Sequence, residues 1–185
     1  MKYCSQCGES VKFKVPPQDN RERYVCDSCG VIHYQNPNNV CGAILTRDNK
    51  VLLCKRAIEP RYGLWTLPAG FMENGETVEQ AARREAVEEA NAEAADLSLF
   101  GVFSMPYISQ VYLMFSGALT DAPISAGEES LEVGLFSQDE IPWDDLAFPV
   151  VRHSLELYFQ HGDARVHHAY FSRDEQRKHT IHFGK

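Results

Sequence analysis

The sequence of 185 residues predicts an α/β protein in which a mixed sheet lies between helices and a small metal-binding unit precedes it. Apolar runs typical of strands come before, around and after one central helix, and a second helical pattern follows late in the chain. This order favours a sheet covered by helices. Two Cys-x₂-Cys pairs open the chain, and a polar, turn-forming run follows at residues 35–39. We therefore expect two units, residues 1–36 and residues 37–185.

The first unit is predicted to be a zinc ribbon. Two pairs of cysteines are separated by 18 residues, a spacing typical of a four-cysteine zinc site. The four are Cys4, Cys7, Cys26 and Cys29. Four thiolates leave no open position on zinc, so the metal is expected to fold the segment and do no chemistry. Two disulfides or free thiols are the alternatives; the chain opens without a signal peptide, which disfavours disulfides and leads us to expect a cytoplasmic protein.

The remaining elements follow from apolar patterning. Short strands are expected at residues 24–25 and 31–34 of the ribbon. In the second unit, strands are expected at residues 40–46, 51–55, 97–105, 111–119 and 132–136, with a hairpin turn at residues 47–50. Residues 150–159 have helical periodicity. The histidine-rich tail after Gly162 is read as surface or interface, with its HTIHF run an added strand or a dimer arm.

The central helix has clear start and stop signals. Thr77, followed three residues later by Gln80, predicts a capping box at its beginning. A narrow stripe of alanines predicts close packing against the sheet. Asn91 follows the last turn, where a residue that tolerates the left-handed conformation is needed.

Three glutamates lie on one face of this helix. Glu85, Glu88 and Glu89 have the spacing i, i+3, i+4. Like charges so placed repel each other and would weaken an isolated helix, so a divalent cation is expected to neutralise them. Oxygen-only ligands indicate Mg²⁺ or Mn²⁺, which commonly act together with substrate phosphates. The alternative is an acidic face solvated by water.

The stretch from Gly70 to Ala92 resembles the Nudix box of the Nudix hydrolase family. That signature is Gly, five residues, Glu, seven residues, Arg-Glu, an aliphatic residue, any residue, Glu-Glu, any residue, Gly and an aliphatic residue. The specified positions are occupied by Gly70, Glu76, Arg84, Glu85, Glu88 and Glu89. Asn91 stands where the family has glycine. The resemblance implies an α/β/α sandwich with a mixed sheet.

The resemblance also implies residue roles. Glu85, Glu88 and Glu89 would be metal-binding and catalytic carboxylates, and the backbone carbonyl of Ala69 would be a further ligand. Glu76 and Arg84 would form a structural salt bridge. Family members add an acid from a later loop; here Glu128, Glu129 and Glu132 are available, and Glu129 is chosen. Solvated loop acids are the alternative.

A ribbon joined to a Nudix box resembles the zinc-ribbon branch of the family, which includes NADH, ADP-ribose and FAD pyrophosphatases. The implied reaction is Mg²⁺-dependent hydrolysis of a nucleoside diphosphate linkage by water, with release of AMP. The NADH enzymes carry a Ser-Gln-Pro-Trp-Pro-Phe-Pro-like run after the box, whereas this chain has FSMPYISQ. Pro106 lies where ADP-ribose-hydrolysing members carry a proline. FAD or ADP-ribose is therefore expected, with NADH or an NAD cap on RNA as the alternative.

The charge and the apolar content of the chain limit the kinds of partner that it can bind. The net charge is −8, made up of +1 for residues 1–36 and −9 for the rest, which disfavours non-specific nucleic-acid binding. No apolar run reaches the ~18 residues that a membrane span needs. A small nucleotide substrate is expected, and the resemblance implies a homodimer. Two other functions remain open: an inert module that binds nucleic acid or a protein through the ribbon, and an isoprenoid diphosphate isomerase, for which Cys54 would have to be reactive.

Substrate contacts are expected from aromatic or basic residues near the box. Trp65 and Phe71 could stack on an adenine, and Arg56 or Arg61 could meet a phosphate. Core packing is the alternative for the aromatic residues, and solvated charge is the alternative for the arginines.

Overall fold

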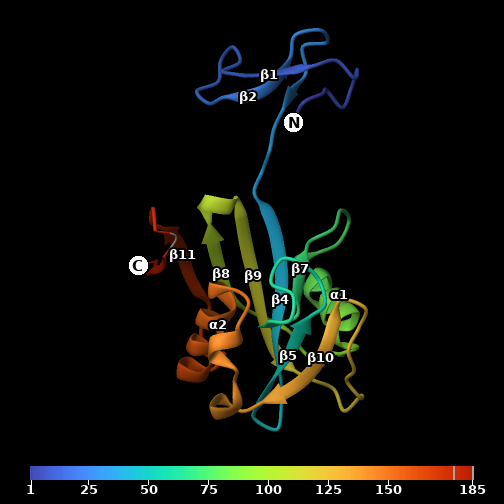
Figure 1. Ribbon diagram of the computed structural model, residues 1–185, viewed down its shortest axis with the longest axis vertical. Helices are drawn as coiled ribbons and strands as arrows, with labels where there is room; N and C mark the ends of the chain where they lie inside the picture. Colours follow the sequence, from blue (N-terminus) through green and yellow to red (C-terminus); the bar gives the residue numbers. More distant parts are fainter. Residues whose placement is uncertain (177, 185) are drawn as a thin grey trace. The chain divides into compact units, whose positions relative to one another are not determined.

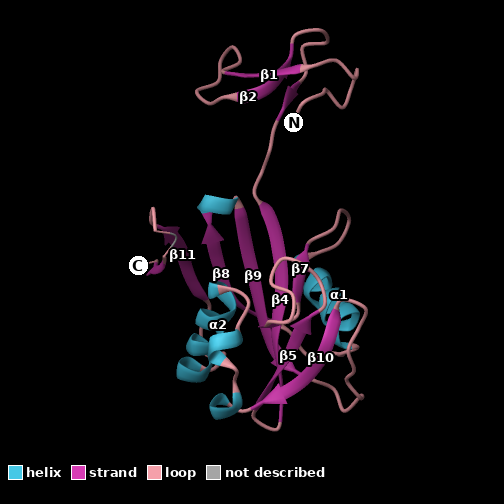
Figure 2. Cartoon of the chain, viewed as in Figure 1, coloured by secondary structure: helices cyan, strands magenta, loops and turns pink. Residues whose placement is uncertain are grey.

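The computed structural model describes residues 1–176 and 178–184. The chain forms two compact units, Met1–Pro37 and Asn38–Lys185 (Figure 1). Each contains its own sheet (Figure 2).

The first unit is a three-stranded antiparallel sheet. Its strands are β1 (Val11–Lys14), β2 (Arg23–Cys26) and β3 (Ile32–His33), paired in that order. The sequence predicted β2 and β3 but not β1, whose side chains are mostly exposed and therefore lack an alternating apolar pattern.

The described residues of the second unit form a nine-stranded mixed sheet. Its main path runs in the order β10-β5-β4-β9-β8-β11-β12, with β6 paired to β5 and β7 to β4. The β4–β9 and β8–β11 pairs are parallel and the others are antiparallel. The strands are β4 (Asn38–Arg47), β5 (Lys50–Arg56), β6 (Trp65–Thr66), β7 (Ala69–Phe71), β8 (Ser98–Met105), β9 (Gln110–Ala118), β10 (Ser130–Phe136), β11 (His167–Arg173) and β12 (His179–Phe183).

Helices α1 (Val78–Ala90) and α2 (Pro149–His161) pack on opposite faces of this sheet (Figure 1). Successive residues of β4 show why: Ile44 belongs to the cluster that contains Leu155 of α2, whereas Leu45 belongs to the cluster that contains the alanines of α1. Three short 3₁₀ helices, η1 (Pro106–Ile108), η2 (Gln138–Glu140) and η3 (Trp143–Asp145), lie in connections. The α/β/α sandwich with a mixed sheet is confirmed.

The β4–β5 hairpin opens soon after its turn, and this opening positions the segment before α1. Asp48 and Asn49 make the turn with φ of 52° and 59°. Strands β4 and β5 pair directly only at Thr46–Val51 and Arg47–Lys50. Beyond these pairs, β7 adds to β4 and β6 adds to β5. The chain therefore reaches α1 from the middle of the sheet.

The C-terminal segment extends the sheet. Its HTIHF run forms β12, antiparallel to β11, as the added-strand alternative expected. His167 is buried against Phe100, and His182 stacks on Tyr170. Across residues 1–176 and 178–184, neither α1 nor α2 nor any shorter helix has the length and apolarity needed to cross a membrane.

Candidate active site

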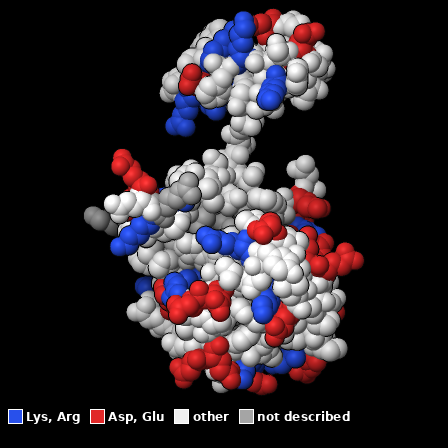
Figure 3. Space-filling view, viewed as in Figure 1, with Lys and Arg blue, Asp and Glu red and all other residues white. Residues whose placement is uncertain are grey.

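A cleft of about 1520 Å³ lies in the second unit, along the face of α1 that carries the glutamates. Acidic and basic side chains gather in adjacent patches on the face of the molecule seen in Figure 3. The cleft is lined by the end of β7, the glutamate face of α1, the loop before β10 and the beginning of α2. The predicted site residues that line it are Arg56, Arg61, Ala69, Gly70, Phe71, Arg84, Glu85, Glu88, Glu89 and Glu129.

Local signals hold α1 in place beside the cleft. The Thr77 hydroxyl accepts a hydrogen bond from the Gln80 N–H, and the Gln80 side chain accepts one from the Thr77 N–H, so the predicted capping box is confirmed. Asn91 adopts the left-handed conformation with φ 46° and ψ 35°, as its position after the last turn predicts. The capping box therefore sets the beginning of α1, and the left-handed Asn91 sets its end.

Arg84 joins the loop to the helix and neutralises two of its acids. Its Nη2 lies 2.9 Å from Glu76 Oε1 and donates to the Phe71 carbonyl at 3.0 Å. Its Nη1 lies 2.6 Å from Glu85 Oε1 and 2.8 Å from Glu88 Oε2. Hydrogen bonds from Arg84 and from the Glu73 N–H lower the pKa of Glu76. The structure therefore contains the ion pair that the resemblance implied, and extends it to Glu85 and Glu88.

Glu89 lacks such a partner. Glu89 is only 5% exposed, and its Oε2 atom is buried without a hydrogen-bond partner among the residues that the structure describes. Burial, with a further contribution from Glu85, raises the pKa of Glu89 to about 8, against an opposing effect of Arg56. Burial also raises the pKa of Glu85, although Arg84 opposes the shift. A buried carboxylate with an unsatisfied oxygen is a costly arrangement that a bound cation would relieve.

Gly70 gives the Glu85 carboxylate its space. A Cβ atom at this position would lie 2.3 Å from Glu85 Oε1 and 2.4 Å from Oε2. Any side chain here would push that carboxylate out of its position beside β7. The glycine of the box is therefore required by close approach, since its φ is not positive.

The loop that carries Glu128 and Glu129 is docked on the C-terminal end of α1. Its Ser125 and Gly127 N–H groups donate to the carbonyls of Ala90 and Glu89 at 3.0 Å each. These bonds satisfy carbonyls that have no partner within the helix. Glu129 lines the cleft and contributes to the raised pKa of both Glu85 and Glu89.

Glu132, the third candidate for the loop acid, has a different position. It lies on β10, 3.7 Å from Lys55, and does not line the cleft. Of the three candidates, Glu128 and Glu129 line the cleft.

The donor set of the cleft fits a hard divalent cation. Carboxylate oxygens from Glu85, Glu88, Glu89 and Glu129 are the ligands that Mg²⁺ and Mn²⁺ prefer. The orphaned Glu89 Oε2 atom is the observation of this structure that fits such an ion. In the described part of the chain only the four cysteines bring metal-ligand atoms within 4.8 Å of one another, and Arg84 holds the carboxylates of Glu85 and Glu88.

The expected substrate contacts divide into two groups. Phe71 and Arg61 are exposed at the cleft, and Arg56 lies over the Phe148 ring at 5.2 Å. Trp65 is outside the cleft: it is buried, packs edge-on against Phe136 and belongs to the core. Trp65 is therefore a core residue, as the alternative to substrate stacking predicted. Burial raises the pKa of the Cys54 thiol well above its ordinary value, against a reactive role in an isomerase.

Some cleft residues could not be singled out from the sequence. Tyr107, Tyr112, Arg173 and His179 line the cleft although they are far from the box. Tyr107 lies in the FSMPYISQ run, which was the only signal available. Arg173 and His179 come from the β11–β12 hairpin, whose position beside η1 depends on the parallel pairing of β11 with β8.

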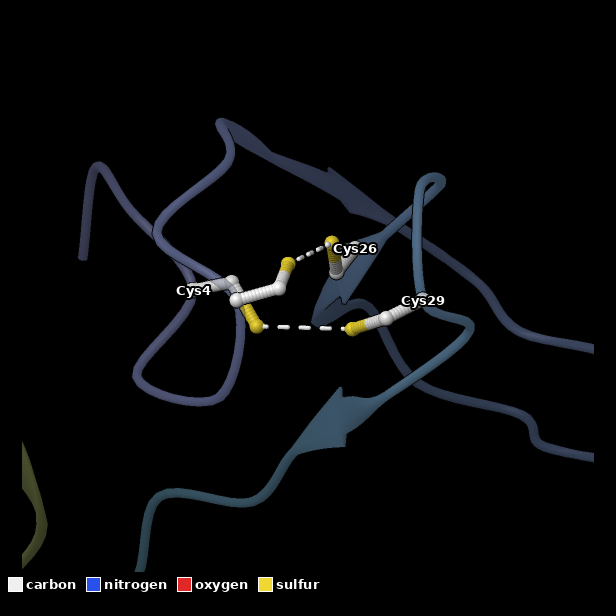
Figure 4. A group of neighbouring side chains, drawn as sticks. Cys4, Cys26 and Cys29 are labelled. Carbon is white, nitrogen blue, oxygen red and sulfur yellow. Dashed lines mark hydrogen bonds between the residues drawn. The ribbon is translucent and has the colours of Figure 1, made fainter.

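The four cysteines of the first unit form the compact cluster that the spacing predicted (Figure 4). The Cys4 and Cys29 Sγ atoms are 3.7 Å apart, and those of Cys7 and Cys26 are 3.5 Å apart. A tetrahedral zinc with Zn–S of about 2.3 Å would separate its sulfurs by about 3.8 Å, whereas a disulfide needs about 2.05 Å. The cluster therefore suggests zinc. Gly8 and Gly30, which follow the pairs, have φ of 79° and 76°, and their N–H groups donate to the Cys4 and Cys26 carbonyls.

Removal of the metal from this cluster is expected to unfold the first unit, because a three-stranded sheet of this size has few buried side chains besides its cysteines. The Cys26→Ser variant and the chelator-treated protein should both lose zinc and show an early melting transition by circular dichroism. Ser28→Ala, at an exposed neighbour, is the control. An unchanged spectrum and melting curve after complete metal removal would show that the cluster is not a structural metal site.

A mixed sheet between two helices, with a cleft along an acid-bearing helix, defines the class of the second unit as an α/β/α protein of the Nudix type. Residues 36–178 match the NUDIX domain family, and residues 2–35 match the Nudix N-terminal zinc-ribbon family. The chain belongs to the Nudix hydrolase family, in its zinc-ribbon branch, as the box and the cysteine pairs predicted.

Individual relatives are similar to different extents. A NUDIX hydrolase from Nitrosomonas europaea, known from its crystal structure, is 50% identical; the match covers 92% of this chain and 98% of that one, with a TM-score of 0.87. The NAD-capped RNA hydrolase NudC of Pseudomonas aeruginosa is 30% identical over 160 residues, 85% of this chain and 55% of that protein. The ADP-ribose pyrophosphatase of Methanocaldococcus jannaschii is 35% identical over 116 residues, 59% of this chain and 67% of that protein. The chain thus spans about half the length of NudC.

Proposed function

We propose that the chain is a divalent-metal-dependent pyrophosphatase that hydrolyses the diphosphate linkage of a nicotinamide dinucleotide, free or as an RNA cap, and releases AMP or the matching 5′-phosphorylated end. The observation that carries the chemistry is the buried Glu89 carboxylate, whose Oε2 atom has no hydrogen-bond partner in the described part of the chain, in a cleft lined by other carboxylates. The similarity to NudC over 85% of this chain supports the dinucleotide. It favours the NADH and NAD-cap alternative over the FAD or ADP-ribose expected from the sequence.

The residues of the cleft have distinct roles in this proposal. Glu85, Glu88 and Glu89, with the Ala69 carbonyl, would hold Mg²⁺ or Mn²⁺, and Glu129 would complete the set or accept a proton from water. When bound, the cation would neutralise charge on the diphosphate and acidify a water molecule. Glu76 and Arg84 keep the loop on the helix. Arg56 and Arg61 would bind phosphate oxygens, and Phe71 would stack on a base.

We also propose that the chain is divided into two domains. Residues 1–36 would form the zinc ribbon and residues 37–185 the hydrolase domain, in line with the compact units and the family matches. A cytoplasmic location, a homodimer and the lack of general nucleic-acid binding remain predictions of the sequence.

ADP-ribose is the second candidate substrate. The specific observation in its favour is the 35% identity to an ADP-ribose pyrophosphatase over 116 residues. One AMP-containing half is common to both candidates, so the chemistry at the carboxylates would be the same.

The experiment that separates these substrates is a panel of NADH, NAD-capped RNA, ADP-ribose, FAD and nucleoside triphosphates, each with Mg²⁺ and with Mn²⁺. We expect the highest kcat/KM for a nicotinamide dinucleotide, with nucleotide products identified by chromatography. A higher value for ADP-ribose would replace the main proposal with the second candidate. Absence of turnover for all members, together with tight RNA binding, would favour the inert module.

A further inference from the structure

One end of the cleft is formed by elements that the family signature does not include. Tyr107 of η1 faces the β11–β12 hairpin: its ring centroid lies 5.3 Å from that of His179, and the Arg173 guanidinium lies 5.9 Å from it. Strand β11 lies next to β8, which leads into η1 (Figure 1). His179 is outside the matched NUDIX region, residues 36–178. We call Tyr107, Arg173 and His179 the hairpin end of the cleft.

The hairpin end is connected to the carboxylates through the cleft. Tyr112, on β9, lines the cleft; it pairs with Val40 of β4, which on its other side pairs with Phe71 at the end of β7. Burial raises the pKa of Tyr112, the nearby Tyr107 adds to the shift, and Arg56 opposes it. Arg56 and Glu89 line the same cleft. The carboxylates, Tyr112 and the hairpin end therefore line one continuous cleft, so one extended ligand could reach both ends.

Polar groups at the hairpin end lack partners in the protein. The Nδ1 atom of His179 is buried and has no hydrogen-bond partner among the described residues. In the same part of the chain neither Arg61 nor Arg173 forms an ion pair. Burial, and then the positive charge of Arg173, lower the pKa of His179; the nearby Asp174 carboxylate opposes this shift, and Arg61 adds a smaller lowering effect. In a chain of net charge −8, positive charge without carboxylate partners at a cleft is a feature that a ligand anion explains.

We propose that Tyr107, Arg173 and His179 form a second substrate subsite, which binds a nucleoside that carries a phosphate outside the diphosphate to be cleaved. Tyr107 stacks on the base, Arg173 binds the phosphate oxygens, and His179 hydrogen-bonds the ribose or the phosphate. This inference rests on the proposed function and narrows its substrate class. ADP-ribose, with one base and no further phosphate, leaves such a subsite unfilled.

Two kinds of substrate would carry a phosphate at this position. In one it is the 2′-phosphate of a dinucleotide such as NADPH, and in the other it is the first phosphodiester after an NAD cap. The test therefore compares kcat/KM for NADH, NADPH and an NAD-capped dinucleotide RNA. We expect at least one phosphate-bearing substrate to exceed NADH roughly tenfold, the effect of one charge-assisted hydrogen bond. Which one does so identifies the source.

Single-residue variants show which side chains produce the substrate preference. Arg173→Ala is expected to remove the preference, chiefly by raising KM for the phosphate-bearing substrates. Tyr107→Leu should raise KM for all three substrates, and Tyr107→Phe should restore it. Tyr170→Ala, on the same hairpin but outside the cleft and stacked on His182, is the control. Equal kcat/KM for all three substrates, or a preference that survives Arg173→Ala, would overturn the subsite.

A binding measurement keeps this inference separate from the proposed hydrolysis. Without added divalent cation, calorimetry should show that adenosine 2′,5′-bisphosphate or adenosine 3′,5′-bisphosphate binds the full chain more tightly than AMP. Arg173→Ala should abolish that difference. If no dinucleotide is hydrolysed but the difference is seen, the proposed function fails and the subsite stands; if dinucleotides are cleaved but both bisphosphates bind no better than AMP, the subsite fails alone.

Discussion

Replacement of Glu89 by glutamine is expected to lower turnover by about two to four orders of magnitude at saturating Mg²⁺. The variant keeps the size of the side chain but removes the charge of Glu89, which, unlike Glu85 and Glu88 on the same helix face, forms no ion pair with Arg84 in the described structure. The check is kcat for the best substrate of the panel. Glu79→Gln is the matched control, because Glu79 lies on the same helix, pairs with Arg83 and does not line the cleft. Equal turnover of the Glu89→Gln variant and the unsubstituted protein would remove Glu89 from the metal site.

The same variant is expected to be more stable than the unsubstituted protein in the absence of divalent cations at pH 8. The fold raises the pKa of Glu89 from 4.5 to about 8, so the folded state binds a proton that the unfolded state has lost. Stability therefore falls as pH rises from 4.5 to about 8, by roughly 5 kcal/mol at most, and is unaffected below that window. Glutamine has no charge to desolvate, although its buried amide offsets part of the gain.

Thermal unfolding at pH 5 and pH 8, without added divalent cation, measures this difference. The Tm advantage of Glu89→Gln should be clear at pH 8 and small at pH 5, and saturating Mg²⁺ should reduce it by stabilising the unsubstituted protein. A Tm difference that does not change with pH would mean that Glu89 titrates normally and is not the buried, unbalanced acid of the cleft.

Gly127→Ala is expected to have the second large effect, on both stability and turnover. A Cβ atom here would lie 1.7 Å from the Glu88 carbonyl oxygen, a backbone atom that cannot move away without disturbing α1. The loop would have to leave the helix end and give up its hydrogen bonds to Ala90 and Glu89. Unfolding free energy should fall by about 1–3 kcal/mol, as for other overpacked sites. Turnover should fall at least tenfold because Glu129 is displaced.

Two further variants separate the parts of this effect. Glu129→Gln removes the acid and leaves the loop docked, so it should lower turnover without changing Tm. Asp121→Ala, at an exposed position in the same connection outside the cleft, should change neither quantity. A Gly127→Ala protein with the melting temperature and turnover of the unsubstituted chain would show that docking of this loop on α1 is not needed.

Features encoded within a short segment were predictable from the sequence. The capping box, the left-handed Asn91 and the alanine face of α1 depend on neighbours within one or two turns, and all three are as expected. The four-cysteine cluster was likewise fixed by its spacing. The order of the strands in the sheet and the hairpin end of the cleft depend on long-range pairing, such as β11 with β8, which local patterns do not contain.

Two aromatic residues near the box show what a local sequence pattern does not predict. Phe71 and Trp65 are both aromatic and close to the box in sequence, yet Phe71 lines the cleft and Trp65 packs in the core. The difference arises because Trp65, in β6, pairs with Lys55 of β5, whereas Phe71 ends β7 at the edge of the cleft. Similarly, the role of Arg84 in holding Glu85 and Glu88 follows from side-chain geometry that a motif does not specify.

The central claim is that the glutamate face of α1 binds a divalent cation. Anomalous diffraction from a crystal soaked in Mn²⁺ with a non-hydrolysable dinucleotide tests it most directly. The account predicts a strong peak about 2.0–2.5 Å from a Glu89 carboxylate oxygen and in contact with the diphosphate. Density for the diphosphate in this cleft without any manganese peak beside Glu89 would contradict it.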